Sequence, residues 1–129
     1  MIMDVKDLRI NDIVRAKAYD NDYRITLIER CGEIAIKKND EIPLMCDVSA
    51  LHGVKVDREL LSRLGAWYDD KKIEHIFTFK GGLRIAVRPQ VSSENYIATR
   101  IGDYRPKYCN FTYIHTLQHW LWDMYKVEL

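Results

Sequence analysis

The stretch from Tyr113 to Tyr125 constrains the fold of this chain more than any other segment. Its aliphatic side chains recur three or four positions apart: Ile114, Leu117, Leu121 and Met124. This spacing places them on one face of an α-helix, and Trp120 widens that face. No other segment is as apolar and as clearly helical. We therefore expect the strands that precede it to pack their inner faces against a C-terminal helix.

The first half of the chain predicts short antiparallel strands in series. Alternating apolar side chains indicate strands at residues 13–18, 23–30 and 33–37. In the second of these the alternation places Tyr23, Ile25 and Leu27 on one side. Such a meander can curl into a small SH3-like barrel. Residues 40–54 are expected to be irregular, because Pro43 interrupts them.

The second half predicts a short capped helix and a second β region. Asp57 is the expected N-cap of a helix over residues 58–64, and Gly65 is its expected stop. Four further strands are expected at residues 73–79, 83–88, 96–101 and 107–111. Gly81-Gly82 is typical of the turn of a hairpin between the first two of these strands.

These elements together predict a single α+β domain, in which the C-terminal helix packs on the sheet. A length of 129 residues is enough for one domain with a core and short for two. The expected parts are an N-terminal β meander (1–50), a short helix (51–65), a second β region (66–111) and the C-terminal helix (112–126).

Three segments of the chain resemble a group of small uncharacterised proteins of Bacteroidetes genomes and their phages. Asp7-Leu-Arg-Ile-Asn-Asp-Ile-Val14 resembles the group's opening LRIGN-x-V, and residues 51–66 resemble its GIPLTEEILLKLGF segment. Residues 113–119 are similar to its YVHQLQN helix. The chain departs from the pattern at Asn11-Asp12, where the group has Gly-Asn. The resemblance implies a source in a mobile element or phage, and it implies no activity and no functional residue.

The cysteines and the N-terminus predict a cytoplasmic protein. Cys31, Cys46 and Cys109 are odd in number and form no CxxC, which is typical of a reducing compartment. Charged residues follow Met1 too soon for a signal peptide, and no apolar run reaches the roughly 18 residues of a membrane span. The sequence therefore predicts no membrane association.

Basic residues concentrate in one part of a chain whose formal net charge is only +1. Between Lys80 and Tyr108 there are six basic and two acidic residues. The candidate binding residues there are Arg84, Arg88, Tyr96, Arg100, Tyr104, Arg105 and Lys107. Arginine neutralises phosphate and tyrosine stacks on bases, so a sheet face with both is typical of a surface for single-stranded nucleic acid or nucleotide.

Two other interpretations of the same residues stay open. The face can be an ordinary solvated surface that forms salt bridges to the acidic first half, and a pI of about 7.7 is low for a dedicated nucleic-acid binder. Tyrosine and arginine are also enriched at protein interfaces, so the face can serve a protein partner or self-association. Trp122 points away from the expected buried face of the terminal helix and is a further candidate partner contact.

The terminal helix also carries two weak candidates for catalysis. His115, His119 and Asp123 lie four residues apart in one row, and a His-x3-His pair can hold a divalent ion. Thr116 stands where an HExxH metalloprotease has its glutamate, so we expect no metal and no other cofactor. Cys109 with His115 could form a thiol–imidazole pair, but no third group that would orient the base is visible.

The sequence thus favours a small non-enzymatic binding or interaction protein. Binding of nucleic acid or nucleotide through the arginines and tyrosines is the more specific hypothesis. The alternatives are a metal- or thiol-dependent hydrolase that uses the C-terminal helix, and a structural or assembly component of a virion.

Overall fold

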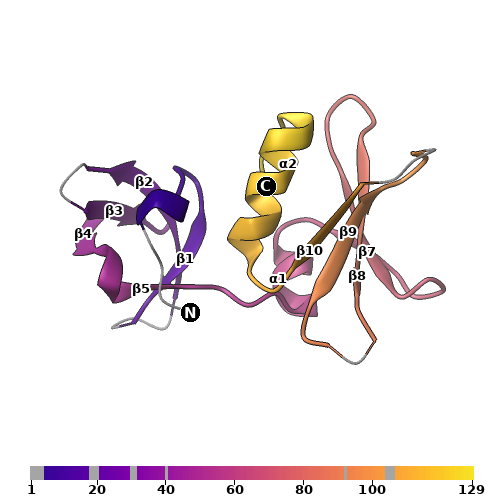
Figure 1. Cartoon of the computed structure of the whole chain (residues 1–129), viewed down its shortest axis with the longest axis horizontal. Helices are drawn as coiled ribbons and strands as arrows, with labels where there is room; N and C mark the ends of the chain where they lie inside the picture. The colour runs from indigo at the N-terminus through magenta and orange to yellow at the C-terminus, as the bar shows by residue number, and fades with distance from the viewer. Residues whose placement is uncertain (1–4, 18–20, 30–31, 40, 92, 104–106) are drawn as a thin grey trace. The chain divides into compact units, whose positions relative to one another are not determined.

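A computed structural model describes residues 5–17, 21–29, 32–39, 41–91, 93–103 and 107–129. The chain divides into two compact units, Met1–Val54 and Lys55–Leu129. Each unit contains one five-stranded antiparallel sheet, and the second also contains two α-helices (Figure 1). The predicted α+β class is therefore confirmed. That the two units fold together as a single domain stays a prediction.

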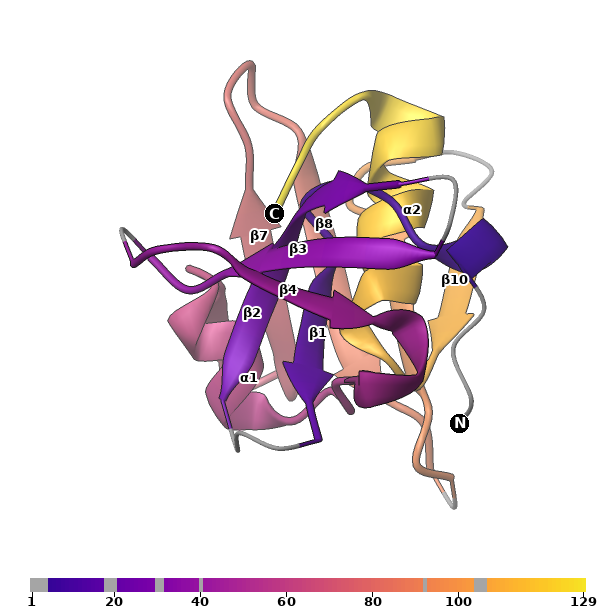
Figure 2. The ribbon, with the colours of Figure 1, turned by 90° about the vertical axis from the view of Figure 1, so that its left-hand side faces the viewer.

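The first unit is a four-stranded meander, extended by a fifth strand that crosses over to its first strand, with two short 3-10 helices. Its elements are η1 (Val5–Asp7), β1 (Ile13–Ala16), β2 (Asp22–Ile28), β3 (Glu33–Lys37), β4 (Leu44–Asp47), η2 (Val48–Ala50) and β5 (Leu51–Gly53). The strands lie in the order β4-β3-β2-β1-β5, which Figure 2 shows in part, and every neighbouring pair is antiparallel. The three strands predicted for this region are confirmed.

The expectation that residues 40–54 are irregular is wrong. This stretch forms β4, η2 and β5. Leu44-Met45-Cys46 shows no alternation of apolar and polar residues, and β5 has only three residues, so the period-two signal of a strand is absent. Among the described strands β4 and β5 are the two edges of the sheet, so the SH3-like barrel considered from the sequence is not closed.

A bulge in β2 changes which side chains of that strand point into the core. The core of the first unit is formed by Leu8, Val14, Ala16, Tyr23, Ile25, Ile34, Ile36 and Leu51. Ile25 faces Ile36 in the register with β3, but the next pair is Leu27 with Ala35, so Thr26 is an extra residue. Leu27, predicted to share a side with Tyr23 and Ile25, therefore points to the outer face and is exposed.

The second unit places two helices against a second meander. Its elements are α1 (Arg58–Arg63), β6 (Trp67–Asp69), β7 (Glu74–Thr78), β8 (Arg84–Pro89), β9 (Tyr96–Arg100), β10 (Tyr108–Phe111) and α2 (Ile114–Tyr125). The strands lie in the order β10-β9-β8-β7-β6. The strands predicted from residue 73 onward are confirmed within a few residues, and β6 was not predicted.

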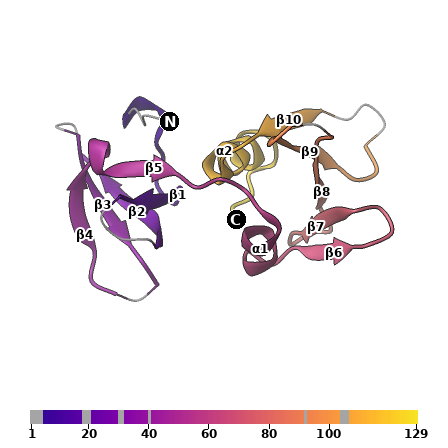
Figure 3. The same cartoon turned by 90° about the horizontal axis from the view of Figure 1, so that it is seen from below.

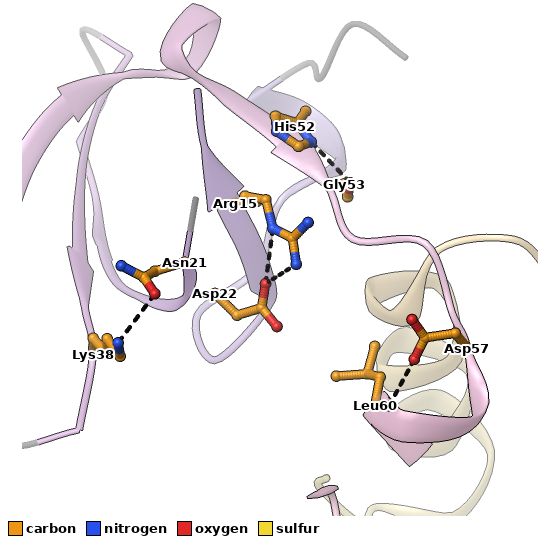
Figure 4. A network of polar contacts seen from close by, with 8 residues as sticks. All are labelled: Arg15, Asn21, Asp22, Lys38, His52, Gly53, Asp57 and Leu60. Carbon is orange, nitrogen blue, oxygen red and sulfur yellow. Dashed lines mark hydrogen bonds and ion pairs between the residues drawn. The ribbon is translucent and has the colours of Figure 1, made fainter. Parts of the chain in front are cut away.

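Local sequence explains where α1 and the β7–β8 hairpin begin and end. The carboxylate of Asp57 accepts a hydrogen bond of 2.7 Å from the backbone N–H of Leu60, which confirms the predicted cap (Figure 4). Gly65 ends the helix with a φ of 101°, a conformation that favours glycine. Gly81 and Gly82 both have positive φ in the turn after β7, as predicted. Ile73 was expected to begin that strand, but it has a φ of 55° and is exposed.

Helix α2 packs on the second sheet, as the sequence predicts. Ile114, Leu117 and Leu121 are fully buried, and the helix contacts β10. Met124, assigned to the same apolar face, is exposed near the end of the helix. Figure 3 shows α1 beside β7 and α2 beside β10 on one side of the sheet. The opposite side of this sheet is covered by neither helix.

Candidate nucleic-acid interface

Arg84 and Arg88 lie on the uncovered face of the second sheet. They alternate along β8 with Ile85 and Val87, both of which are fully buried on the side of the helices. The guanidinium groups of Arg84 and Arg88 are therefore directed away from the core, as predicted from the alternation. We call this side of the second sheet the outer face.

Tyr96 and Arg100 lie on the opposite, helix-covered side. In the register of β8 with β9, Arg100 is the partner of Ile85 and Tyr96 is the partner of Pro89. Partners in an antiparallel pair extend to the same side of the sheet. Burial raises the pKa of the Tyr96 phenol, and Arg100 lies 5.7 Å from the ring centre of Tyr125 in α2. The predicted set therefore does not form one face.

Three remaining members of the set precede β10. Lys107 is exposed just before this strand. Tyr104 and Arg105 lie outside the described residues.

A row of cross-strand partners spans the outer face from one edge of the second sheet to the other. Its members, one from each strand, are Trp67, Ile76, Ala86, Thr99 and Tyr108. The residues at the two ends of the row are aromatic, and both Trp67 and Tyr108 are 62% exposed. Ile76 and Ala86 between them are buried, so the row has an apolar floor.

Trp67 was not among the residues predicted from the sequence. Its strand has only three residues and lies beside a charged turn, so β6 gives almost no periodic signal. One signal in the sequence could have indicated it. In any strand that includes residues 67–69, Trp67 and Asp69 point to one side and Tyr68 points to the other.

Arginines and aromatic rings form a cross on the outer face with Ala86 at its centre. Arg84 and Arg88 lie two residues on either side of Ala86, or about 7 Å along the strand. Trp67 and Tyr108 lie two strands on either side, or about 10 Å across the sheet. The small side chain of Ala86 leaves the centre of the cross flat.

The guanidinium groups of Arg84 and Arg88 form no hydrogen bond, ion pair or ring contact with any described residue. Other arginines are engaged. Arg15 binds Asp22 at 2.7 Å in the first unit (Figure 4), and Arg58 lies 4.4 Å from the ring centre of Tyr68. Both positive charges are available to a ligand.

Among the described residues, carboxylates lie near Arg88 at one end of the cross and not beside Arg84 at the other end. Glu74 lies opposite Arg88 when the register of β7 with β8 is continued by one pair, and Asp69 is the partner of Glu74 in β6. Arg84 instead has Thr78 as its partner. The positive potential is therefore stronger on the side of Arg84 than on the side of Arg88.

Two members of the histidine row of α2 have their rings close together. The ring centres of His115 and His119 lie 5.7 Å apart, and His115 is buried. Asp123 is exposed, one helical turn further along. Within the described part of the chain, no three His, Cys, Asp or Glu side chains are grouped so that they could hold a metal ion.

Cys109 has the opposite of the properties that a nucleophile needs. Its thiol is buried on the helix-covered side of β10, and burial raises its pKa to about 11. A catalytic cysteine requires a lowered pKa. The thiol therefore stays protonated at neutral pH and packs as an apolar group.

Trp122 lies on the solvent side of α2, where the sequence places it. Its ring is partly exposed, and the ammonium group of Lys126 lies 5.5 Å from the ring centre. The indole is thus in contact with a cation of the same chain.

No helix in the described ranges has the length and apolarity that a membrane crossing requires. Comparison of the chain with protein-family models, with curated proteins and with solved structures gave no match. The resemblance to proteins of Bacteroidetes genomes and phages stays a prediction.

Proposed function

We propose that the protein binds single-stranded nucleic acid on the outer face of its second sheet. The observation that carries this proposal is the cross around Ala86, with two exposed rings on one axis and two unengaged guanidinium groups on the other. Exposed aromatic side chains on an antiparallel sheet stack on unpaired bases, while arginines neutralise the phosphates.

The spacing of the rings favours a strand over a mononucleotide. Trp67 and Tyr108 lie four strands apart, or roughly 19 Å, so one base cannot contact both rings. A single strand that crosses the sheet would stack one base on each ring and pass over Ala86. This requires about four nucleotides, the lower end of known site sizes.

The acidic residues orient the strand. Asp69 and Glu74 lie on the side of Arg88 and would repel phosphate there. We therefore expect the phosphate backbone to pass on the side of Arg84, so that Arg84 contributes more to affinity than Arg88 does.

Fluorescence anisotropy of labelled single strands of about 12 nucleotides tests the proposal. We expect binding that weakens as salt is raised. Removing two phosphate contacts with Arg84→Glu/Arg88→Glu should lower the slope of log K against log salt by about 1.4. Trp67→Ala and Tyr108→Ala should each weaken binding by about 1–3 kcal/mol, the usual effect of losing a stacked base.

Matched variants separate this surface from general effects of charge and aromatic content. Arg63→Glu/Lys126→Glu makes the same change in net charge at exposed positions in α1 and at the end of α2, on the helix-covered side of the sheet, and Trp122→Ala removes an indole from α2. Both should bind like the wild type. Absence of salt-sensitive binding to every homopolymer tested would overturn the proposal, and the exposed rings would then be assigned to a protein partner.

The observations support a non-enzymatic role over hydrolysis. The raised pKa of Cys109 argues against a thiol nucleophile, and the histidine pair gains no third ligand from the described residues. We further propose a cytoplasmic location, based on the free Cys46 and Cys109, and a mobile-element source, based on the resemblance of the three sequence segments.

A further inference from the structure

The outer face of the first sheet carries an apolar row across three strands. Leu27, Ala35 and Met45 are successive cross-strand partners in β2, β3 and β4. They lie on the side opposite the core, because Ile34 and Ile36 of β3 point inward. Leu27 is 45% and Met45 is 53% exposed, and Ala35 between them is buried. We call these three residues the apolar row.

Two pairs of like charges flank the apolar row. Glu33 faces Asp47 on one side, and Arg24 faces Lys37 on the other. Like charges directly opposite each other destabilise a sheet. A hydrogen bond from the backbone N–H of Ser49 lowers the pKa of Asp47, so this carboxylate is ionised at neutral pH. The chain therefore carries an acidic pair on one side of an exposed apolar surface and a basic pair on the other.

We propose that this face binds a second copy of the chain about a twofold axis parallel to the apolar row. After a half turn about this axis, the apolar row of one chain lies over the apolar row of the second chain. The same rotation places Glu33 in β3 of each copy over Lys37 in β3 of the other. Asp47 in β4 and Arg24 in β2 then lie on either side of this pair. Glu33 and Lys37 of each copy then gain an opposite neighbour, and Leu27 and Met45 are removed from water.

The spacing along β3 makes the face complementary to itself. Glu33 and Lys37 each lie two residues from Ala35, or about 7 Å, in opposite directions. A twofold axis at Ala35 therefore aligns Glu33 of each copy with Lys37 of the other. Such an isologous contact closes at a dimer. Nucleic acid would be repelled by Glu33 and Asp47, so it is a poorer occupant of this face.

The contact is expected to be weak and sensitive to salt. Only three apolar residues from each copy contribute, so the interface falls in the class below about 1,200 Å² that is typical of transient complexes. Exposed charges such as Glu33 are screened within about 8 Å at physiological ionic strength. The dimer should therefore be populated at high protein concentration and low salt.

Charge reversal with mixing tests the proposal by sedimentation equilibrium. Lys37→Glu and Glu33→Lys, each alone, should weaken self-association at least about tenfold, because each places like charges across the interface. An equimolar mixture of the two variants should regain association, because the reversed charges then face each other. Both sites are at the surface, and circular dichroism should show an unchanged fold.

Controls and outcomes distinguish this contact from others. Lys17→Glu should associate like the wild type, and Leu27→Ser should weaken association whereas Val91→Ser, at another exposed apolar side chain, should not. A wild type that stays monomeric at every concentration and salt would overturn the proposal. A mixture that associates no better than its components would do the same. The nucleic-acid affinity of Lys37→Glu should match the wild type, since it concerns the other sheet.

Discussion

The two sheets of this protein have similar architecture and differently charged outer faces. Each sheet has five antiparallel strands and one side packed into a core, although in the first sheet β5 crosses over to pair with β1. The first has acidic and basic pairs on opposite sides of an apolar row, so its charges sum to zero and are complementary under a half turn. The second places two unengaged arginines and two exposed aromatic rings around Ala86.

The difference shows that composition alone is a poor guide to the partner of a sheet face. Arg24 and Arg84 both extend from outer faces, but Arg24 donates a hydrogen bond to the carbonyl of Asn11 and faces Lys37, whereas Arg84 faces Thr78. In the two proposals made above, it is the arrangement of the neighbouring charges that distinguishes the expected partners of these arginines.

The largest expected effect concerns whether the two cores unfold together. Ile34→Ala in the first unit and Leu121→Ala in the second each remove a fully buried side chain, so each should cost about 2–5 kcal/mol. All three tryptophans, Trp67, Trp120 and Trp122, lie in the second unit, so indole fluorescence reports on that unit alone. If the chain is a single domain, Ile34→Ala lowers the fluorescence-detected midpoint as much as the midpoint by circular dichroism.

If Ile34→Ala leaves the unfolding midpoint detected by fluorescence unchanged, the two units are instead independent domains. Leu121→Ala is the matched control, because it must shift the fluorescence transition in either case. Val91→Ala, at an exposed side chain, should shift neither transition.

An intermediate loss of stability is expected when the helix cap of either unit is removed. Asp57 accepts a hydrogen bond from Leu60 N–H at 2.7 Å, and Asp47 accepts one from Ser49 N–H at 2.9 Å. Asp57→Ala should destabilise the protein by about 1 kcal/mol, the usual value for an α-helix cap. Asp47→Ala should cost less, because it also removes the repulsion from Glu33. Urea titration measures both, and an equal loss for the two variants would contradict this account.

The smallest expected effect is a dependence on pH that belongs to the second unit. Burial lowers the pKa of His75 below its usual 6.5, and the charge of Arg58 lowers it further. The unfolded chain then binds a proton more readily than the folded chain as the pH falls below 6.5. Stability should therefore decrease with acidification, by at most about 1.4 kcal/mol for each pH unit.

Thermal melts of the wild type and of His75→Phe at pH 7 and pH 5 measure this contribution. The variant keeps a ring beside Tyr68 and cannot titrate, so its melting temperature should fall less on acidification. An equal fall in both proteins would show that other groups control the acid response.

The sequence predicts those helices and strands whose signals lie within a few neighbouring residues. It does not predict which strands pair with one another. The cap at Asp57, the stop at Gly65 and the buried face of α2 follow from contacts within a few residues, and the structure confirms them. Strands of three or four residues, such as β5 and β6, are too short to show a period and depend on their neighbours.

The candidate site was predicted in part, because a sheet face is defined by register. Arg84 and Arg88 share a strand, so their common side follows from alternation alone. The side of Arg100 depends on its pairing with Ile85 across two strands, which a single sequence does not encode locally. The same limit hid the alignment of Trp67 with Tyr108, since four successive pairings connect them.

The bulge at Thr26 has a consequence for how this protein can vary in length. Thr26 is the extra residue between the Ile25–Ile36 and Leu27–Ala35 pairs, and its hydroxyl donates a hydrogen bond to the carbonyl of Ala35. Deleting it would leave a regular strand in which Ile25 still points inward and Leu27 outward. We therefore expect a variant of this protein that lacks Thr26 to keep the same core and the same outer surface.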